Sequence, residues 1–122
     1  MKKKLLIFHI GFPKTGTTYL QKNFLNFKEI EPLYHLKKHN SFWKLNNYLF
    51  NNNVFASYEM NNKKIIQNFI ENVKKIKTEK KILLYSYEGI LNPYRFNLKK
   101  NLKNFFSIIK HLKKDYRIKI LL

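Results

Sequence analysis

The feature that most constrains the fold is an alternation of short apolar runs with longer amphipathic segments. Residues 4–10, 81–87 and 117–122 are strand-sized apolar runs, and the first two are apolar at nearly every position, as buried parallel strands usually are. Residues 61–77 and 96–114 repeat apolar side chains at helical spacing. Strands that alternate with helices of this length predict parallel strands joined by right-handed crossovers. We therefore expect an α/β fold with a parallel sheet.

The segments between the first run and residue 61 give a weaker pattern. Thr18 and Gln21 have the form of a capping box and predict a helix after a sharp turn at residues 11–16. Residues 28–58 are rich in Asn and predict only a short helix around 42–50. The apolar positions of the first helix would be Leu20, Phe24 and Phe27.

The length of the chain and its last residues limit the number of domains that we expect. The 122 residues suffice for one small domain. The last predicted strand ends on Ile118-Lys-Ile-Leu-Leu122, whereas chain termini are usually polar surface segments. We expect residues 1–122 to be a single, partial domain that is truncated after its third strand.

The positive charge of the chain is weak evidence for nucleic-acid binding. The chain has 25 Lys and Arg against 7 Asp and Glu, a net charge of +18, but only Arg95 and Arg117 are Arg, the residue that nucleic-acid readers favour. Lys, Asn, Ile and Phe make up over half of the chain, and all four have codons that begin with two A or T bases. Codon bias on a solvated surface therefore explains the Lys excess better than selection for nucleic acid does. A small basic module that binds nucleic acid or another polyanion is kept as an alternative.

The composition also excludes several classes of protein. The absence of Cys excludes a disulfide scaffold, a zinc ribbon and a cysteine nucleophile, and fits a cytoplasmic protein. No apolar run approaches the roughly 20 residues of a transmembrane helix.

The loop Gly11-Phe-Pro-Lys-Thr-Gly-Thr-Thr18 carries the clearest chemistry. It lies between the first predicted strand and the first predicted helix, where open α/β sheets bind anionic ligands. Free backbone N–H groups and the helix dipole favour phosphate or sulfate there. Gly11 and Gly16 allow close approach of the backbone, and Lys14 adds a positive charge.

The nucleotide-triphosphate loop G-x-x-x-x-G-K-[ST] is the obvious comparison. The glycine spacing agrees, but Thr17 occupies the position of its Lys. The only Asp, Asp115, precedes a predicted strand instead of following one, so a Mg²⁺ ligand is lacking. A nucleotide kinase-like protein is therefore disfavoured and remains a second alternative.

The string from Phe8 to Gln21, and above all Pro13-Lys-Thr-Gly-Thr-Thr18, resembles the 5′-phosphosulfate loop of sulfotransferases that use 3′-phosphoadenosine 5′-phosphosulfate (PAPS). Weaker similarities are His39-Asn-Ser-Phe, after the first helix, and Ser86-Tyr-Glu-Gly-Ile90, at the end of the next strand. The resemblance implies a P-loop-like, three-layer α/β fold. It also implies transfer of a sulfuryl group from PAPS, without a metal, to a hydroxyl or amine of a small molecule or glycan.

The resemblance also implies roles for particular residues. Lys14 and the loop N–H groups would stabilise the leaving phosphate. His39 is the first candidate for the base that takes the acceptor proton, Glu88 the second and His35 the third. Ser86 would donate to the phosphate or satisfy a turn. We interpret His9 as a packed strand residue and His111 as a helix-face residue. The residues expected to bind PAPS are Pro13, Lys14, Thr15, Gly16, Thr17 and Thr18.

The chain departs from the family pattern after its last predicted strand. In the family, an Arg and then a Ser that follow this strand hold the 3′-phosphate, and a later segment with Gly and Lys encloses the adenosine. The sequence stops at Leu122, before these positions, and Arg117 precedes the strand. We therefore expect this chain to carry only the 5′-phosphosulfate half of the family's site.

Overall fold

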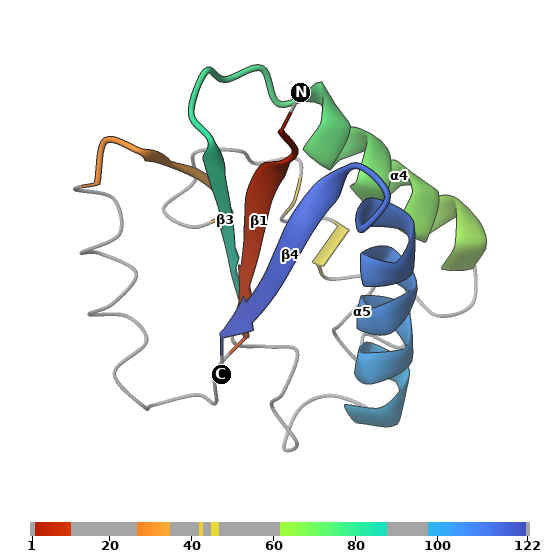
Figure 1. Ribbon diagram of the computed structural model, residues 1–122. Coiled ribbons are helices and arrows are strands. Elements are labelled where there is room, and N and C mark those ends of the chain that lie inside the picture. Colours follow the sequence, from red (N-terminus) through yellow and green to blue (C-terminus); the bar gives the residue numbers. More distant parts are fainter. Residues whose placement is uncertain are drawn as a thin grey trace.

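The protein has an α/β fold built on a parallel sheet (Figure 1). The computed structural model describes residues 2–10, 27–34, 42, 45–46, 62–87 and 98–121. Within them, four strands form one sheet in the order β2-β3-β1-β4, and all neighbouring strands are parallel. The strands are β1 (Lys4–His9), β2 (Ile30–Tyr34), β3 (Ile82–Ser86) and β4 (Tyr116–Leu121).

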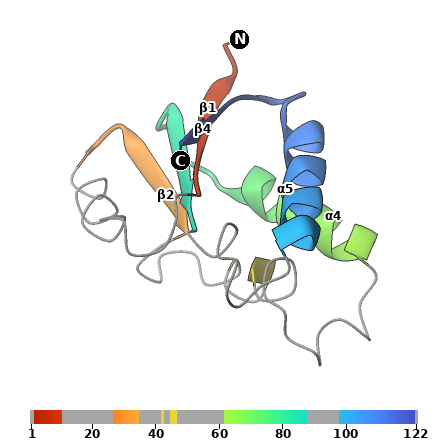
Figure 2. The same ribbon diagram turned by 90° about the horizontal axis from the view of Figure 1, so that it is seen from below.

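Two helices cover one face of this sheet (Figures 1 and 2). Helix α4 (Asn62–Lys75) connects β2 to β3, and helix α5 (Leu98–Leu112) connects β3 to β4. Each helix has a continuous apolar stripe, and that stripe is buried against the strands because it cannot be left in water at low cost.

The core lies between this face of the sheet and the two helices. Phe8 of β1 contacts the rings of Tyr85 and Phe105 edge-on, with centroids 5.6 and 5.2 Å apart. Phe69 of α4 lies 5.2 Å from both Tyr85 and Phe42. Edge-to-face pairs at these distances stabilise a core beyond the area that they bury. The aromatic residues therefore form one connected cluster across the helix–sheet interface.

One buried polar contact lies inside this cluster. The Tyr85 hydroxyl donates a hydrogen bond to the Asn46 side-chain oxygen, and both residues are buried. The Asn46 amide nitrogen has no partner among the described residues. A buried donor without a partner costs about 1–3 kcal/mol, so this contact is a weak point of the core.

Most of the predicted elements are confirmed, with ends shifted by one or two residues. The three apolar runs are β1, β3 and β4, and the two amphipathic segments are α4 and α5. Of the short helix expected around 42–50, the described residues Phe42, Leu45 and Asn46 are helical. Phe27 was expected on the first helix, but it lies outside any helix and is exposed.

The number of strands was predicted wrongly. The sheet has four described strands instead of three, because residues 30–34 form the edge strand β2, so the last strand of the chain is the fourth and not the third. Pro32 conceals this strand in the sequence, since proline lacks the N–H that a central strand needs. At the edge the strand tolerates it, with an irregular register between Pro32 and Tyr34.

The three-layer, P-loop-like architecture stays a prediction. Both described helices lie on the same face, so the described residues form two layers. The helix expected after Thr18 would belong to the other layer, and it falls outside the described residues.

Candidate functional site

The strand order creates a topological switch point between β1 and β3. From β1 the chain continues to β2, on the far side of β3, and from β3 it continues to β4, on the far side of β1. Neighbouring parallel strands whose connections leave in opposite directions open a crevice at their carboxyl ends, where α/β proteins bind ligands. The carboxyl ends of β1 and β3 are therefore the expected position of a ligand site.

A buried side-chain pair joins the two strands at this point. His9 is the last residue of β1 and Ser86 the last of β3, and the two are register partners. His9 Nδ1 lies 2.8 Å from Ser86 Oγ, within hydrogen-bond distance. The side chains are 4% and 1% exposed, so the bond is shielded from competing water.

Backbone hydrogen bonds continue the sheet by one residue past these strand ends. The Tyr87 N–H donates to the His9 carbonyl at 2.9 Å, and the Ile10 N–H donates to the Leu121 carbonyl at 3.0 Å. The next residue after Ile10 is Gly11 and the next after Tyr87 is Glu88. The segments that carry the phosphosulfate-loop motif and one candidate base therefore begin from adjacent, hydrogen-bonded positions.

The acidic side chains are unevenly distributed over the sheet. Here the amino edge is the edge at which the four strands begin, and the carboxyl edge is the one at which they end. Of the five described acidic residues, four lie at or near the amino edge, and Glu71 lies in the middle of α4. The four are Glu29 and Glu31 around the start of β2, Glu79 before β3, and Asp115 before β4.

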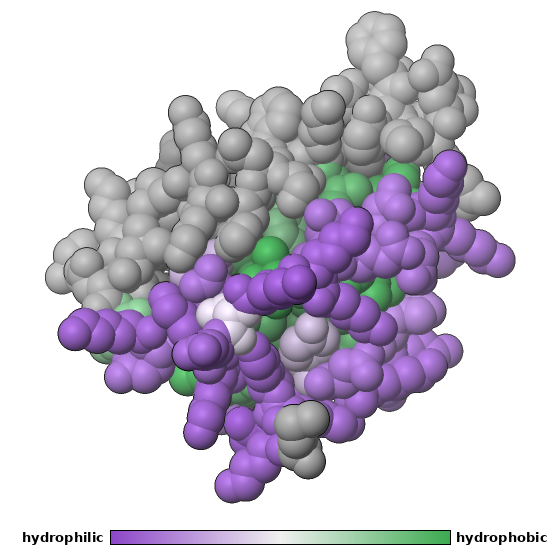
Figure 3. All heavy atoms as spheres, turned by 90° about the horizontal axis from the view of Figure 1, so that it is seen from above, coloured by the Kyte–Doolittle hydropathy of each residue, from purple (hydrophilic) through white to green (hydrophobic). Residues whose placement is uncertain are grey.

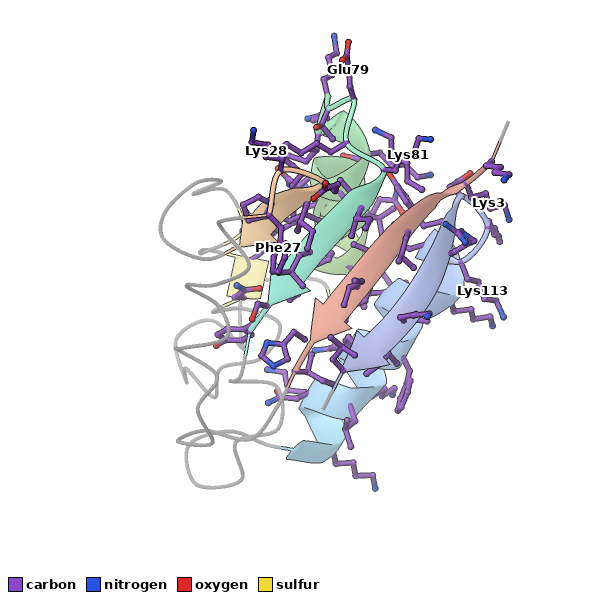
Figure 4. All side chains as sticks on the ribbon, turned by 60° about the vertical axis from the view of Figure 1, so that its left-hand side comes forward. Lys3, Phe27, Lys28, Glu79, Lys81 and Lys113 are labelled. Atoms are coloured by element: carbon purple, nitrogen blue, oxygen red, sulfur yellow. The ribbon has the colours of Figure 1, made fainter. Side chains whose placement is uncertain are left out.

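The described ion pairs belong to the amino edge as well. Lys80 contacts Glu31 at 3.3 Å, and Lys74 contacts Asp115 at 3.1 Å. Figure 3, which looks onto this end of the molecule, shows hydrophilic residues gathered over it. Figure 4 shows Glu79 extending outward beyond this edge, with Lys28 and Lys81 nearer the strands. The amino edge is thus a mixed-charge, solvated surface.

The carboxyl edge has the opposite character. Helices α4 and α5 both start on this side of the sheet, and their first turns contain no acidic residue. They contain lysines instead: Lys63 and Lys64 in α4, and Lys99 and Lys100 in α5. Helix N-termini carry partial positive charge, so within the described residues this edge favours an anionic ligand.

The residues expected to bind PAPS or to catalyse transfer lie outside the described residues. This holds for Pro13, Lys14, Thr15, Gly16, Thr17 and Thr18, and equally for His35, His39 and Glu88. The described residues give the positions from which their segments start: β1 for the loop, β2 for the two histidines, and β3 for Glu88.

Three other expectations can be compared with the structure. His111 lies on the exposed face of α5, with Nδ1 2.8 Å from the Ser107 carbonyl, as predicted. His9 is packed in a strand, also as predicted, but the sequence reading missed its bond to Ser86. Ser86, which was expected to bind the phosphate or to satisfy a turn, thus has a partner on the neighbouring strand. The signal for this bond in the sequence was that His9 and Ser86 are polar residues at the carboxyl ends of two predicted buried strands.

The described residues contain no cluster of three or more His, Cys, Asp or Glu that could hold a metal ion. None of the described helices is both long and apolar enough to cross a membrane. Comparisons of the chain with protein-family models, with curated proteins and with solved structures found no match.

Proposed function

We propose that this protein is a PAPS-dependent sulfotransferase that transfers a sulfuryl group to a hydroxyl or amine acceptor. One observation carries the proposal: the string Pro13-Lys-Thr-Gly-Thr-Thr18 begins four residues after His9, the last residue of β1, which is the strand at the switch point. A Gly-containing loop at that place suits a phosphosulfate, because backbone N–H groups can surround its oxygens.

The charge distribution supports an anionic ligand at the same edge. The described acidic residues lie away from the carboxyl edge, and lysines occupy the first turns of α4 and α5 there. A donor with a 5′-phosphosulfate and a 3′-phosphate would be attracted to this edge over distances of about a Debye length.

In the proposed reaction, the acceptor oxygen or nitrogen attacks sulfur as the bond from sulfur to the bridging phosphate oxygen breaks. The acceptor proton passes to a base, and adenosine 3′,5′-bisphosphate leaves with the bridging oxygen. Lys14 and the loop N–H groups would stabilise the charge that develops on that oxygen. Glu88 is the base to test first, because its segment starts from the strand next to β1, whereas the segment of His39 starts from the edge strand β2.

The test is calorimetric titration of adenosine 3′,5′-bisphosphate, without Mg²⁺, into the wild type, Lys14→Ala and Lys113→Ala. Lys113 is exposed and lies beyond the end of α5, near the amino edge (Figure 4), so its removal changes the net charge equally without touching the proposed site. We expect binding by the wild type and by Lys113→Ala, and at least about tenfold weaker binding by Lys14→Ala, since a hydrogen bond to a charged group contributes about 1.5–3 kcal/mol.

Other outcomes separate the alternatives. Equal losses in the two variants, with steep salt dependence and binding to any DNA, would indicate a general polyanion binder. Tighter binding of ATP with Mg²⁺ than of the bisphosphate would indicate a kinase-like protein. No binding of the bisphosphate by the wild type would refute the sulfotransferase proposal.

A further inference from the structure

The His9–Ser86 pair differs from every other register pair between β1 and β3. The five pairs run from Leu5–Ile82 to His9–Ser86, and only the last is polar on both strands. It is also the last register pair of β1 and β3, at the switch point. A polar pair therefore occupies the one place in this ladder where a ligand site is expected.

The pair lies on the face of the sheet opposite α4 and α5. Phe8 and Tyr85 point into the core on the helix side, where Phe8 also contacts Phe105. Because side chains alternate along a strand, the next residues, His9 and Ser86, point to the other face. They are nevertheless buried, so their polar groups need partners inside the protein.

Stability alone gives little reason for a polar pair here. Replacing both partners of a buried hydrogen bond by apolar groups of similar shape can be nearly neutral, and three of the four pairs that precede this one are apolar on both strands. A directional bond instead fixes the separation and orientation of the two strand ends, which apolar packing specifies less tightly.

We propose that His9 is a positioning residue of the sulfotransferase site, an inference that rests on the proposed function. Its Nδ1 bond to Ser86 Oγ holds the end of β1 against the end of β3. It thereby sets where the loop that begins at Gly11 stands relative to the segment that begins at Glu88. The pair acts on the donor through these two segments, so its loss loosens donor binding without removing a donor contact. Small displacements at a site of this kind are costly, because binding depends on groups held in the right geometry.

The test compares four variants. His9→Asn keeps a polar nitrogen near the position of Nδ1, and His9→Leu has nearly the same shape as Asn without any polar group. Ser86→Ala removes the other partner. Leu84→Val is the matched control, because Leu84 is equally buried on the same strand and face, two residues before Ser86, and makes no polar contact through its side chain.

Two quantities are measured for each variant: resistance to urea, and affinity for adenosine 3′,5′-bisphosphate by calorimetry. We expect His9→Leu and Ser86→Ala to bind about fivefold to tenfold more weakly, the loss typical of one buried hydrogen bond. We expect His9→Asn to bind within about twofold of the wild type. Leu84→Val should lose resistance to urea but keep its affinity. A double variant, His9→Leu with Ser86→Ala, should bind no more weakly than either single variant, because both remove the same bond.

Each outcome bears on a different claim. If the wild type binds the bisphosphate and both His9→Leu and Ser86→Ala bind equally well, His9 has no positioning role and the proposed function stands. If affinity falls in step with urea resistance across all variants, Leu84→Val included, the pair is merely structural and the inference is refuted. If the wild type does not bind, the proposed function fails and the inference fails with it. Should His9→Leu not fold, Ser86→Ala, which removes a single atom, decides the question.

Discussion

Replacing Tyr85 by Phe removes one oxygen from the centre of the core and leaves the ring packing unchanged. Tyr85 and Asn46 are 0% and 1% exposed, and the hydroxyl donates to the Asn46 side-chain oxygen. Without the hydroxyl, the Asn46 side-chain oxygen loses its partner, and the Asn46 amide nitrogen already has none among the described residues. Stranding a buried acceptor costs about 1–3 kcal/mol, which corresponds to a fall of about 1 M in the urea midpoint of a domain of this size.

A second substitution tests whether the loss comes from the stranded amide. Leu has nearly the shape of Asn, so Asn46→Leu in the Tyr85→Phe background removes both orphaned groups at once. We expect the double variant to be more stable than Tyr85→Phe alone, because apolar partners on both sides restore a satisfied core. Urea unfolding monitored by circular dichroism, with an unchanged slope, measures the effect. Tyr116→Phe, at a half-buried residue, is the control and should change stability by no more than about 0.5 kcal/mol at neutral pH.

Two further predictions concern alkaline stability and the aromatic core. Burial, and then the nearby Asp115 carboxylate, raise the pKa of Tyr116 above 10.0, so the folded state holds this proton more tightly than the unfolded state does. The contribution of this group to the free energy of unfolding is complete below pH 10 and is lost as the pH rises through the folded pKa. Tyr116→Phe should therefore lose less stability above pH 10 than the wild type. A parallel decline in both proteins would show that Tyr116 is not the cause of the alkaline loss. Phe8→Ala should lower the free energy of unfolding by about 3–5 kcal/mol. Phe106→Ala, at a side chain 58% exposed, should lower it by less than about 1 kcal/mol. Similar urea midpoints for the two variants would show that the core does not centre on Phe8.

The helices and the buried strands could be read from local patterns. Apolar residues such as Ile65, Phe69 and Val73 recur at the period of a helix, and the apolar residues of β1 and β3 form continuous runs. These patterns follow from the geometry of one element against one apolar surface, so each segment carries them by itself. The Gly11–Thr18 motif directly follows the first strand in the sequence, but it lies outside the described residues, so its loop conformation stays a prediction.

The edge strand β2 could not be read in this way. Glu31 and Pro32 interrupt its apolar pattern, and both are compatible with a strand only because of their surroundings. Glu31 is held by Lys80, a residue 49 positions away, and Pro32 is accepted because the strand lies at an edge. Local propensity is overridden when distant groups satisfy what a segment cannot satisfy alone.

The sequence by itself determined the α/β class, the two described helices and the three apolar strands. Only the tertiary structure decided that β1 lies inside the sheet between β3 and β4, and that His9 meets Ser86, 77 residues away along the chain. The physical reason is that a pattern reports how deeply a segment will be buried but not which segment will cover it. Strand order depends on which crossover connections bury the apolar stripes of both helices against the sheet, and those contacts join segments that are far apart in the sequence.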